Sequence, residues 1–174
     1  MEKGLMRVGL MADSHDRIPA IAEFVKQMQA AGVSMLIHAG DYVSPFALRP
    51  IEEASMSLAG VFGKNDGDQQ GLRARATAGF GAELFESPHS FEVAGQRILV
   101  VHDIGDVQPR SIESHSIVVH GFTHQQEMKT RGDTLIVNPG ESCGWVYGTP
   151  RAAILDLDAK TVEFLTLDPA HWTT

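Results

Sequence analysis

Short apolar runs of about strand length recur along the chain, and the first three are continuously apolar instead of alternating with polar residues. Continuous runs of this length are typical of strands that are buried on both faces of a sheet. The pattern therefore predicts that the chain starts with a sheet covered on both sides. Strands are expected at residues 6–12, 35–39, 56–62, 98–101, 117–119, 135–137, 152–157 and 162–167.

A helix is predicted between the first two strands, in the segment IPAIAEFVKQMQAAG. Pro19 suits the first turn of this helix, and Gly32 marks its end. Ser44, as an N-cap followed by a proline, predicts a second, short helix after the second strand. Helical segments are also expected at residues 69–78 and 109–113. The apolar positions at helical spacing in the first helix are Ile18, Ile21, Phe24, Val25 and Met28.

From residue 87 onward the pattern changes to paired strands with tight turns: FEV-AGQ-RILVV, QEMKT-RGD-TLIVN and AILDLD-AK-TVEFLTL. This layout favours an α/β fold with a parallel first half and an antiparallel second half, built as two packed sheets flanked by helices. The 174 residues contain no linker, repeat or low-complexity segment, so a single domain over residues 1–174 is expected.

Composition limits the kinds of binding partner and the cellular location that the protein is expected to have. No stretch approaches the about 18 consecutive apolar residues that a membrane span needs, and the N-terminus does not join a basic segment to an apolar one, so no export signal is expected. The single cysteine, Cys143, suits a reducing cytoplasm. A net charge of −8 argues against bulk nucleic-acid binding. A cytoplasmic protein is therefore expected, and a homo-oligomer is left open.

Polar residues gather directly after the predicted strands, in the segments ADSH, HAGD, GKND, VHD and HGFTH. In open α/β sheets the carboxyl ends of the strands are where ligands bind. Buried carboxylates and imidazoles cost several kcal/mol unless they are paired or bound to a metal. Five such clusters in one chain therefore predict a cation site at this edge.

The order of these motifs resembles the signature of calcineurin-like metallophosphoesterases: DxH, GD, GNxD, a lone His after a strand, then GHxH. The resemblance is closest to the small bacterial and archaeal phosphodiesterase branch, which also contains a related eukaryotic retromer subunit. NPGESCG and the hairpin AILDLDAKTVEFLTL are similar to the end of that branch, so the resemblance covers almost the whole chain. It implies a four-layer α/β/β/α sandwich of two mixed sheets.

The resemblance also implies the metal ligands. Asp13, His15 and His124 would hold a first ion, Asp41 would bridge to a second, and His102 would contribute to that second ion. The remaining ligands of the second ion would be the asparagine of GNxD and the first histidine of GHxH. Mixed carboxylate and imidazole ligands suit a divalent transition metal, namely Mn, Fe, Zn, Co or Ni.

Two positions depart from the family pattern. Lys64 stands where the pattern has its asparagine, and Phe122 stands where it has a histidine. Lys64 is therefore interpreted as a counter-ion of Asp41, with Asp103 as a second carboxylate that it could neutralise. The apolar ring of Phe122 would keep the vacated position dry. An alternative is a one-residue slip that lets Asn65 reach the metal and turns Lys64 to solvent. At least one ion is expected, with the second position degraded.

The segment GKND supplies the candidate catalytic residues, Lys64, Asn65 and Asp66, of which Lys64 and Asn65 are also candidates for binding the substrate phosphate. Asn65 stands where many family members place a catalytic histidine, so strong general-acid help is not expected. Activated aryl phosphodiesters are then the most suitable test substrates.

Three functions remain in view. The leading prediction is a metal-dependent phosphoesterase that hydrolyses phosphodiesters or small phosphate esters through a metal-activated water. The alternative is a catalytically weak or inactive binding or scaffold protein on the same fold. A nucleotide-binding sensor would share the site but lack turnover.

Overall fold

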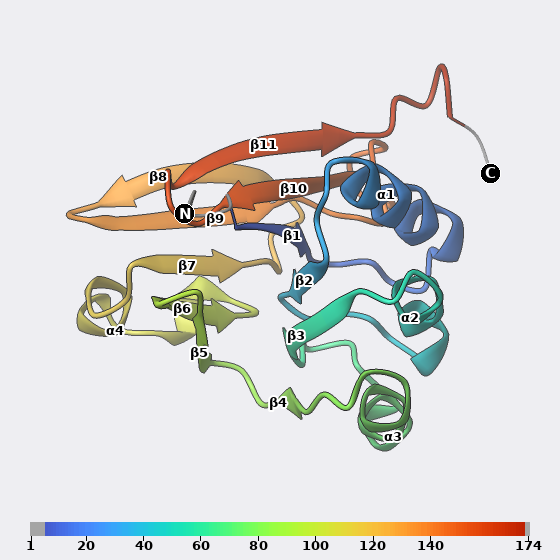
Figure 1. Cartoon of the computed structure of the whole chain (residues 1–174), viewed down its shortest axis with the longest axis horizontal. Helices are drawn as coiled ribbons and strands as arrows, with labels where there is room; N and C mark the ends of the chain where they lie inside the picture. Colours follow the sequence, from blue (N-terminus) through green and yellow to red (C-terminus); the bar gives the residue numbers. More distant parts are fainter. Residues whose placement is uncertain (1–5, 173–174) are drawn as a thin grey trace, which may run out of the picture.

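The computed structural model describes residues 6–172, and its first sheet has six strands in the order β11-β10-β1-β2-β3-β4. Strands β1 to β4 are parallel to one another, whereas the hairpin of β10 and β11 joins β1 in antiparallel register (Figure 1). The predicted strands of the first half are confirmed, and the two-residue β4 is additional. The strands are β1 (Arg7–Met11), β2 (Met35–His38), β3 (Ser57–Val61), β4 (Leu84–Phe85), β10 (Arg151–Asp156) and β11 (Thr161–Thr166).

The second sheet has five strands in the order β5-β6-β7-β9-β8. The predicted hairpins β5–β6 and β8–β9 are antiparallel, but β6, β7 and β9 run parallel in its centre. The expectation of an antiparallel second half was therefore wrong: a helical connection separates β6 from β7, and β8 turns back so that β9 lies beside β7. The strands are β5 (His89–Val93), β6 (Gln96–Val101), β7 (Ile117–His120), β8 (Gln126–Arg131) and β9 (Thr134–Pro139).

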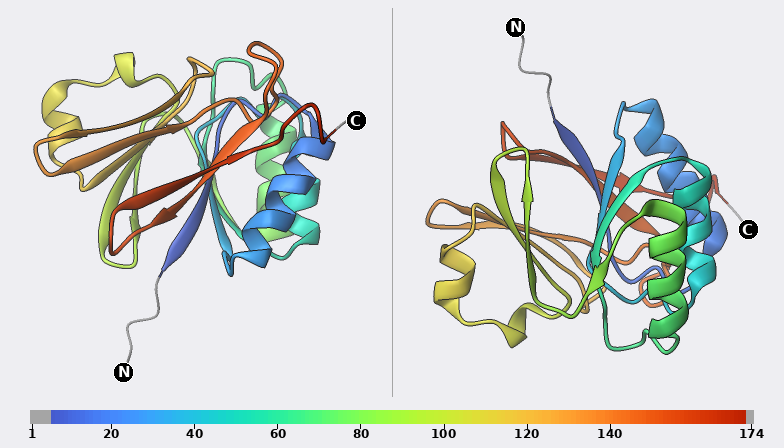
Figure 2. Two further views of the ribbon diagram at one scale, coloured as in Figure 1. Left: turned by 90° about the horizontal axis from the view of Figure 1, so that it is seen from above. Right: turned by 60° about the horizontal axis from the view of Figure 1, so that its bottom comes forward.

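Helices cover the outer faces of the two packed sheets, which gives the predicted four layers (Figure 2). The first sheet is covered by α1, α2 and α3, whereas α4 lies on the far side, against the second sheet. The short helix expected after Ser44 is split into a 3-10 turn and an α-helical turn. The helical elements are α1 (Ile18–Ala30), η1 (Pro45–Leu48), α2 (Arg49–Glu53), α3 (Gln69–Phe80), η2 (Ile104–Asp106) and α4 (Pro109–Glu113).

Separate apolar clusters hold the layers together. The predicted apolar face of α1 packs on the first sheet through Ile21, Phe24 and Met28, all nearly free of solvent contact. Between the sheets, Leu10 of β1 and Val119 of β7 belong to one continuous cluster. Full burial of such a side chain contributes about 1.5–3 kcal/mol, so the two sheets are bound firmly face to face.

The carboxyl ends of strands from both sheets meet at one edge of the sandwich. The backbone N–H of Asp13, after β1, donates to Gly40 O, after β2. Across the sheets, the backbone N–H of Phe122, after β7, donates to the Asp13 carboxylate at 3.0 Å. The loops that carry the polar motifs are therefore joined directly by hydrogen bonds.

Candidate metal centre

Four of the predicted ligands come together at this edge. Asp13 and His15 follow β1, Asp41 follows β2 and His124 follows β7. One ligand atom from each of the four lies within 4.8 Å of the others. Both carboxylates are buried and both imidazoles are partly exposed, so the group forms a cluster that solvent reaches from the histidine side.

The same four residues share an unusual backbone conformation. Their φ angles are 51° for Asp13, 39° for His15, 62° for Asp41 and 61° for His124. Positive φ is uncommon for residues other than glycine and persists only where the surrounding structure enforces it. Here the enforcement is visible, because the backbone N–H of His15 donates to Asp41 O at 3.1 Å. The fold thus holds the four side chains in strained turns that point them at one another.

Three buried atoms of the site lack a hydrogen-bond partner among the described residues: Asp13 Oδ1, His15 Nε2 and His102 Nε2. Each unpaired buried polar atom costs about 1–3 kcal/mol, so three in one place need an explanation. A carboxylate oxygen and two imidazole nitrogens are the donor types that bind divalent transition metals. The residues present therefore fit the ion that the cluster implies.

Burial and hydrogen bonding separate the two carboxyl groups of the cluster. Burial raises the pKa of Asp13 to about 6. Burial also opposes ionisation of Asp41, but the nearby His102 imidazole and the hydrogen bonds from Asn65 outweigh it and hold the Asp41 pKa below its usual range. For His102, burial opposes protonation, yet the contact with Asp41 raises its pKa. The metal-free site thus holds one ionised carboxylate next to one that takes a proton near pH 6.

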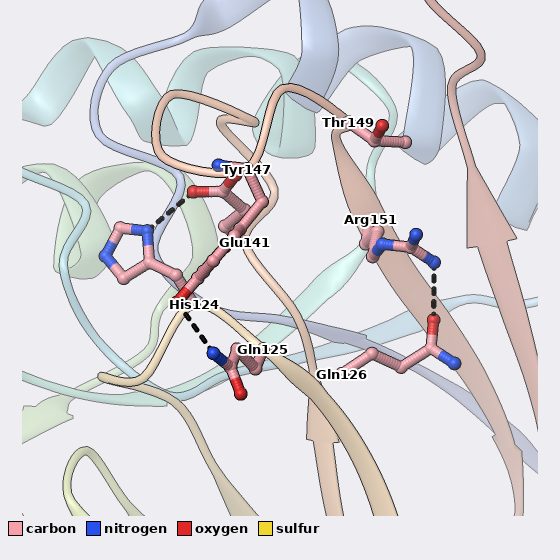
Figure 3. A pocket seen from close by; sticks show the side chains of 7 residues that line it. All are labelled: His124, Gln125, Gln126, Glu141, Tyr147, Thr149 and Arg151. Carbon is pink, nitrogen blue, oxygen red and sulfur yellow. Dashed lines mark hydrogen bonds and ion pairs between the residues drawn. The ribbon is translucent and has the colours of Figure 1, made fainter.

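His124 is oriented by a buried glutamate that the sequence analysis did not single out (Figure 3). Its Nδ1–H donates to Glu141 Oε2 at 2.7 Å, and its Nε2 lies 3.7 Å from Asp13 Oδ1. A carboxylate on the far nitrogen is the usual partner of a metal-binding histidine, because it fixes the tautomer and the ring. The available signal was the acid in NPGES directly after a strand, at the same edge as the other motifs.

Glu141 also fixes the loop that follows it. Its Oε2 accepts from the backbone N–H of Val146 at 3.0 Å, and its Oε1 accepts from that of Tyr147 at 2.6 Å. Cys143 lies 3.7 Å from the same carboxylate, but burial raises the pKa of its thiol to about 12. With its oxygens engaged and the thiol protonated, Glu141 serves as support for His124 and the loop.

Beside His124 is a pocket of about 370 Å³, lined by His124, Gln125, Gln126, Glu141, Tyr147, Thr149 and Arg151 (Figure 3).

The loop after β3 places Asn65, and not Lys64, against Asp41. The backbone N–H of Asn65 donates to Asp41 Oδ1, and its side-chain Nδ2 to Oδ2, both at 2.8 Å. Lys64 is half exposed, and its Nζ pairs with Asp103 at 2.8 Å. Of the two carboxylates that Lys64 was expected to neutralise, it pairs with Asp103 and not with Asp41, because the backbone of this loop turns Asn65 inward. The arrangement matches the alternative of a one-residue slip.

Asp66 fastens this loop to the one that carries Asp41. Its carboxylate accepts from the backbone N–H groups of Asp41, Val43 and Gly63, at 3.1, 2.8 and 2.6 Å. A side chain at Gly63 would collide with the Asp41 carboxylate, so only glycine allows this approach. The contacts of Asp66 therefore fix the backbone of the two loops that carry Asp41 and Asn65.

Phe122 and His102 form the border of the cluster on the Lys64 side. His102 donates from Nδ1 to Ala39 O at 2.8 Å, which leaves Nε2 facing Asp41 Oδ2 at 3.5 Å. The Phe122 ring meets the His102 ring edge-on with centroids 5.7 Å apart, and Lys64 Nζ lies 3.9 Å from its centroid. The Phe122 ring is 42% exposed, so it lies beside the space between His102 and Asp41 without closing it off from solvent.

Comparison with known proteins assigns the chain to a family. The sequence matches the calcineurin-like phosphoesterase superfamily domain over residues 6–160, and the chain belongs to this superfamily. A phosphodiesterase of Methanocaldococcus jannaschii is 28% identical over 166 residues, which cover 94% of this chain and 100% of the relative. The solved structure of an archaeal phosphodiesterase has a TM-score of 0.87 at 28% identity and covers 93% of this chain and 100% of its own. Vps29 from Chaetomium thermophilum, with a TM-score of 0.66 at 16% identity over 93% of this chain and 96% of its own, shows the fold alone.

These matches confirm the resemblance and the fold class that the motif order predicted. The chain is therefore a hydrolase of the metallophosphoesterase type, a metal-dependent class, and the cluster provides a group of residues able to hold an ion. Within residues 6–172, no helix combines the length and the apolarity needed to cross a membrane.

Proposed function

We propose that this protein hydrolyses phosphodiesters or small phosphate esters at the cluster of Asp13, His15, Asp41 and His124. One observation carries the proposal: four ligand atoms lie within 4.8 Å of one another, and Asp13 and His15 each have a buried atom that finds no hydrogen-bond partner within residues 6–172. The fully aligned phosphodiesterase of Methanocaldococcus jannaschii supports the phosphodiester class of substrate.

The ion would be a divalent Mn, Fe, Zn, Co or Ni, held by these four residues. When bound, such an ion acts as a Lewis acid on a phosphoryl oxygen and makes a water more acidic. Hydrolysis forms a bond between a water oxygen and phosphorus, breaks the bond from phosphorus to the departing alcohol oxygen and transfers one proton to that oxygen or to solvent. The protein's own residues would hold the phosphate ester in position next to the ion and the water.

Lys64 is proposed to bind the substrate phosphate. Its ammonium lies at the rim, held between the Asp103 carboxylate and the Phe122 ring, and the hydrogen bond to Asp103 raises its pKa, so it is charged at neutral pH. A half-exposed ammonium can donate to a phosphate oxygen without being withdrawn from the cluster.

Asn65 and Asp66 act through the geometry of Asp41 in this proposal. Asn65 donates twice to the Asp41 carboxylate, which holds both oxygens in place and keeps the group ionised. Asp66 holds the backbone of the same loops. A strong proton donor for the leaving group is missing from GKND, which favours substrates whose alcohol departs as a stable anion.

A second ion position is proposed to be incomplete. His102 Nε2 and Asp41 face it, but Asn65, which the loop turns inward, donates its side-chain amide to Asp41, and Phe122 stands where the family pattern has a histidine. The charge of Lys64 adds to the loss, because an ammonium near the position repels another cation. One tightly held ion per chain is therefore expected.

Both parts of the proposal are tested by metal analysis and an assay on the same sample. The protein would be stripped with a chelator, loaded with each of the five metals and assayed with bis(4-nitrophenyl) phosphate. We expect hydrolysis that depends on the added metal and a content of one ion per chain after gel filtration. Two retained ions would contradict the incomplete second position. Lack of hydrolysis with all five metals would contradict the enzymatic proposal and favour the scaffold alternative.

A further inference from the structure

The exposed hydrophobic side chains are concentrated around the metal centre. Of the six large ones that are exposed within residues 6–172, five lie on segments that follow β2, β7 and β9, at the edge that carries the cluster. Isolated exposed hydrophobic residues are common, but three consecutive ones are not. The five are Phe46, Phe122 and the consecutive residues Trp145, Val146 and Tyr147.

The segment Trp145–Tyr147 is firmly held although its side chains face solvent. Glu141, which is fully buried, accepts from the backbone N–H groups of Val146 and Tyr147 and also holds the ring of His124. A single carboxylate thus links the metal centre to the exposed segment. The exposure is therefore a property of an ordered loop.

Trp145 has the geometry of a stacking platform. The Arg17 guanidinium covers one face of the indole at 4.4 Å from its centroid, and Arg17 is itself fixed by donating to Cys143 O at 2.6 Å. With the guanidinium in this position, Trp145 is still 61% exposed. An aromatic face that is backed by a cation and open on the other side suits a second flat ring.

The platform lies within reach of a group attached to a phosphorus at the cluster. The backbone N–H of Cys143 donates to Asp13 O at 3.1 Å, so the chain at Cys143 is bonded directly to a predicted ligand. Trp145 is two residues further on, and two residues span at most about 7 Å. The indole can therefore contact the ester arm that is not the leaving group.

We propose that Trp145, flanked by Val146, binds a flat aromatic arm of the substrate, so that the preferred substrates are aryl or nucleoside phosphodiesters instead of alkyl ones. The inference rests on the proposed function, because it assigns the retained arm of the same ester. Stacking of a base on an aromatic side chain is worth about 10-fold or more in affinity.

Three esters with the same leaving group test this assignment: methyl 4-nitrophenyl phosphate, 4-nitrophenyl phenyl phosphate and 4-nitrophenyl thymidine 5′-phosphate. We expect the manganese-loaded wild type to prefer at least one aromatic ester over the methyl ester by about 10-fold in kcat/KM. Trp145→Ala should reduce that preference to about one. Met128→Ala, which removes the exposed hydrophobic residue away from this edge, should retain it.

The outcomes separate the two proposals. A preference for the phenyl ester alone identifies an aryl arm, and a preference for the thymidine ester identifies a nucleoside arm; both support the inference. Equal rates for the three esters, or a preference that survives Trp145→Ala, would overturn it while leaving the phosphodiesterase intact. Lack of hydrolysis of every ester would overturn the proposed function. In that case the binding of aromatic phosphates to Trp145 would still test the inference.

A fluorescence measurement provides that second readout. The sequence has two tryptophans, so Trp172→Phe leaves Trp145 as the single emitter. Thymidine 5′-phosphate or phenyl phosphate should quench this emission in the manganese-loaded protein, whereas methyl phosphate should not. The reciprocal variant, Trp145→Phe, should show no such difference. Equal responses to aromatic and methyl phosphates in the Trp172→Phe protein would overturn the inference without reference to turnover.

Discussion

The two sides of the metal cluster are built in different ways. On the His124 side, the imidazole is backed by Glu141, which is fully buried and is bonded to three groups at once. On the Lys64 side, an ammonium that is half exposed lies on the Phe122 ring, and His102 Nε2 has no hydrogen-bond partner among residues 6–172.

This difference in structure is the basis for the proposal that the cluster holds one ion tightly and lacks a complete second position. A histidine whose far nitrogen is held by a buried carboxylate is ready to bind an ion without further rearrangement. On the Lys64 side, the ammonium and the Phe122 ring supply no lone pairs, so only His102 and Asp41 are left to bind an ion there. The following experiments test whether the asymmetry in structure is an asymmetry in function.

The largest effect is expected from Asp13→Asn, which removes a charge from the complete side. Lewis-acid stabilisation by a metal is worth several kcal/mol, so losing the ion should lower kcat/KM by about 1000-fold or more. Metal content and hydrolysis of bis(4-nitrophenyl) phosphate would be measured together. Near-normal activity in this variant would mean that Asp13 does not hold the ion.

The same variant should be more stable than the metal-free wild type at high pH. Burial raises the folded pKa of Asp13 to about 6 from its ordinary value of 3.8, so the folded state favours the protonated carboxyl. The stability from this group is complete below the unfolded pKa and is lost as pH rises through about 6, a change of about 3 kcal/mol. Denaturant unfolding of both proteins at pH 4 and pH 8 measures the difference. A gap that does not grow with pH would contradict the assignment.

Glu141→Gln should lower ion affinity by about 10- to 100-fold, because the histidine loses its charged partner. Glu141→Ala should lose more, since it also releases the two backbone N–H groups of the aromatic loop. Glu127→Gln is a matched control, because Glu127 pairs with His120 at 3.1 Å outside the cluster. Equal losses in the control and in Glu141→Gln would show that Glu141 has no special part in binding the ion.

Lys64→Met should raise KM by about 10-fold while leaving the affinity for the first ion in place, because a charge-assisted contact to phosphate is lost. Lys129→Met is the control: the two lysine side chains are 50% and 51% exposed, and each pairs with a carboxylate at 2.8 Å. Steady-state kinetics with bis(4-nitrophenyl) phosphate compares them. The assignment fails if both variants have the same KM.

The smallest effect is a factor of two in stoichiometry. Lys64→Asn combined with Phe122→His restores the residues of the family pattern, and manganese content should rise from one to two ions per chain. The measurement is metal analysis after gel filtration, together with the rate of phosphodiester hydrolysis. An unchanged content would indicate that these two residues are not what limits binding at the second position.

Most of the fold was predictable because its signals are local. Continuous apolar runs predicted β1, β2 and β3, and the spacing of Ile21, Phe24 and Met28 predicted the buried face of α1. The order of strands in the second sheet was not predictable, because the tight turn between β8 and β9 specifies their pairing but not the strand beside which β9 is inserted. That choice depends on packing between distant segments.

The convergence of Asp13, His15, Asp41 and His124 followed from their motifs, since each motif comes after a strand. The side chains that the sequence analysis misplaced or passed over depend on backbone direction. Whether Lys64 or Asn65 faces Asp41 is decided by one turn of the loop after Gly63. The part of Glu141 depends on a hydrogen bond across 17 residues, which no local pattern contains.

The origin of the four cluster residues links the centre to the integrity of the whole molecule. Three of them follow strands of the first sheet and His124 follows a strand of the second. An ion bound to all four would therefore cross-link the two sheets. The complete set of four ligands forms only after both sheets have packed together. A ligand that binds only the native state stabilises the native state by mass action. Release of the ion would then accompany separation of the layers, and metal retention would report an intact sandwich.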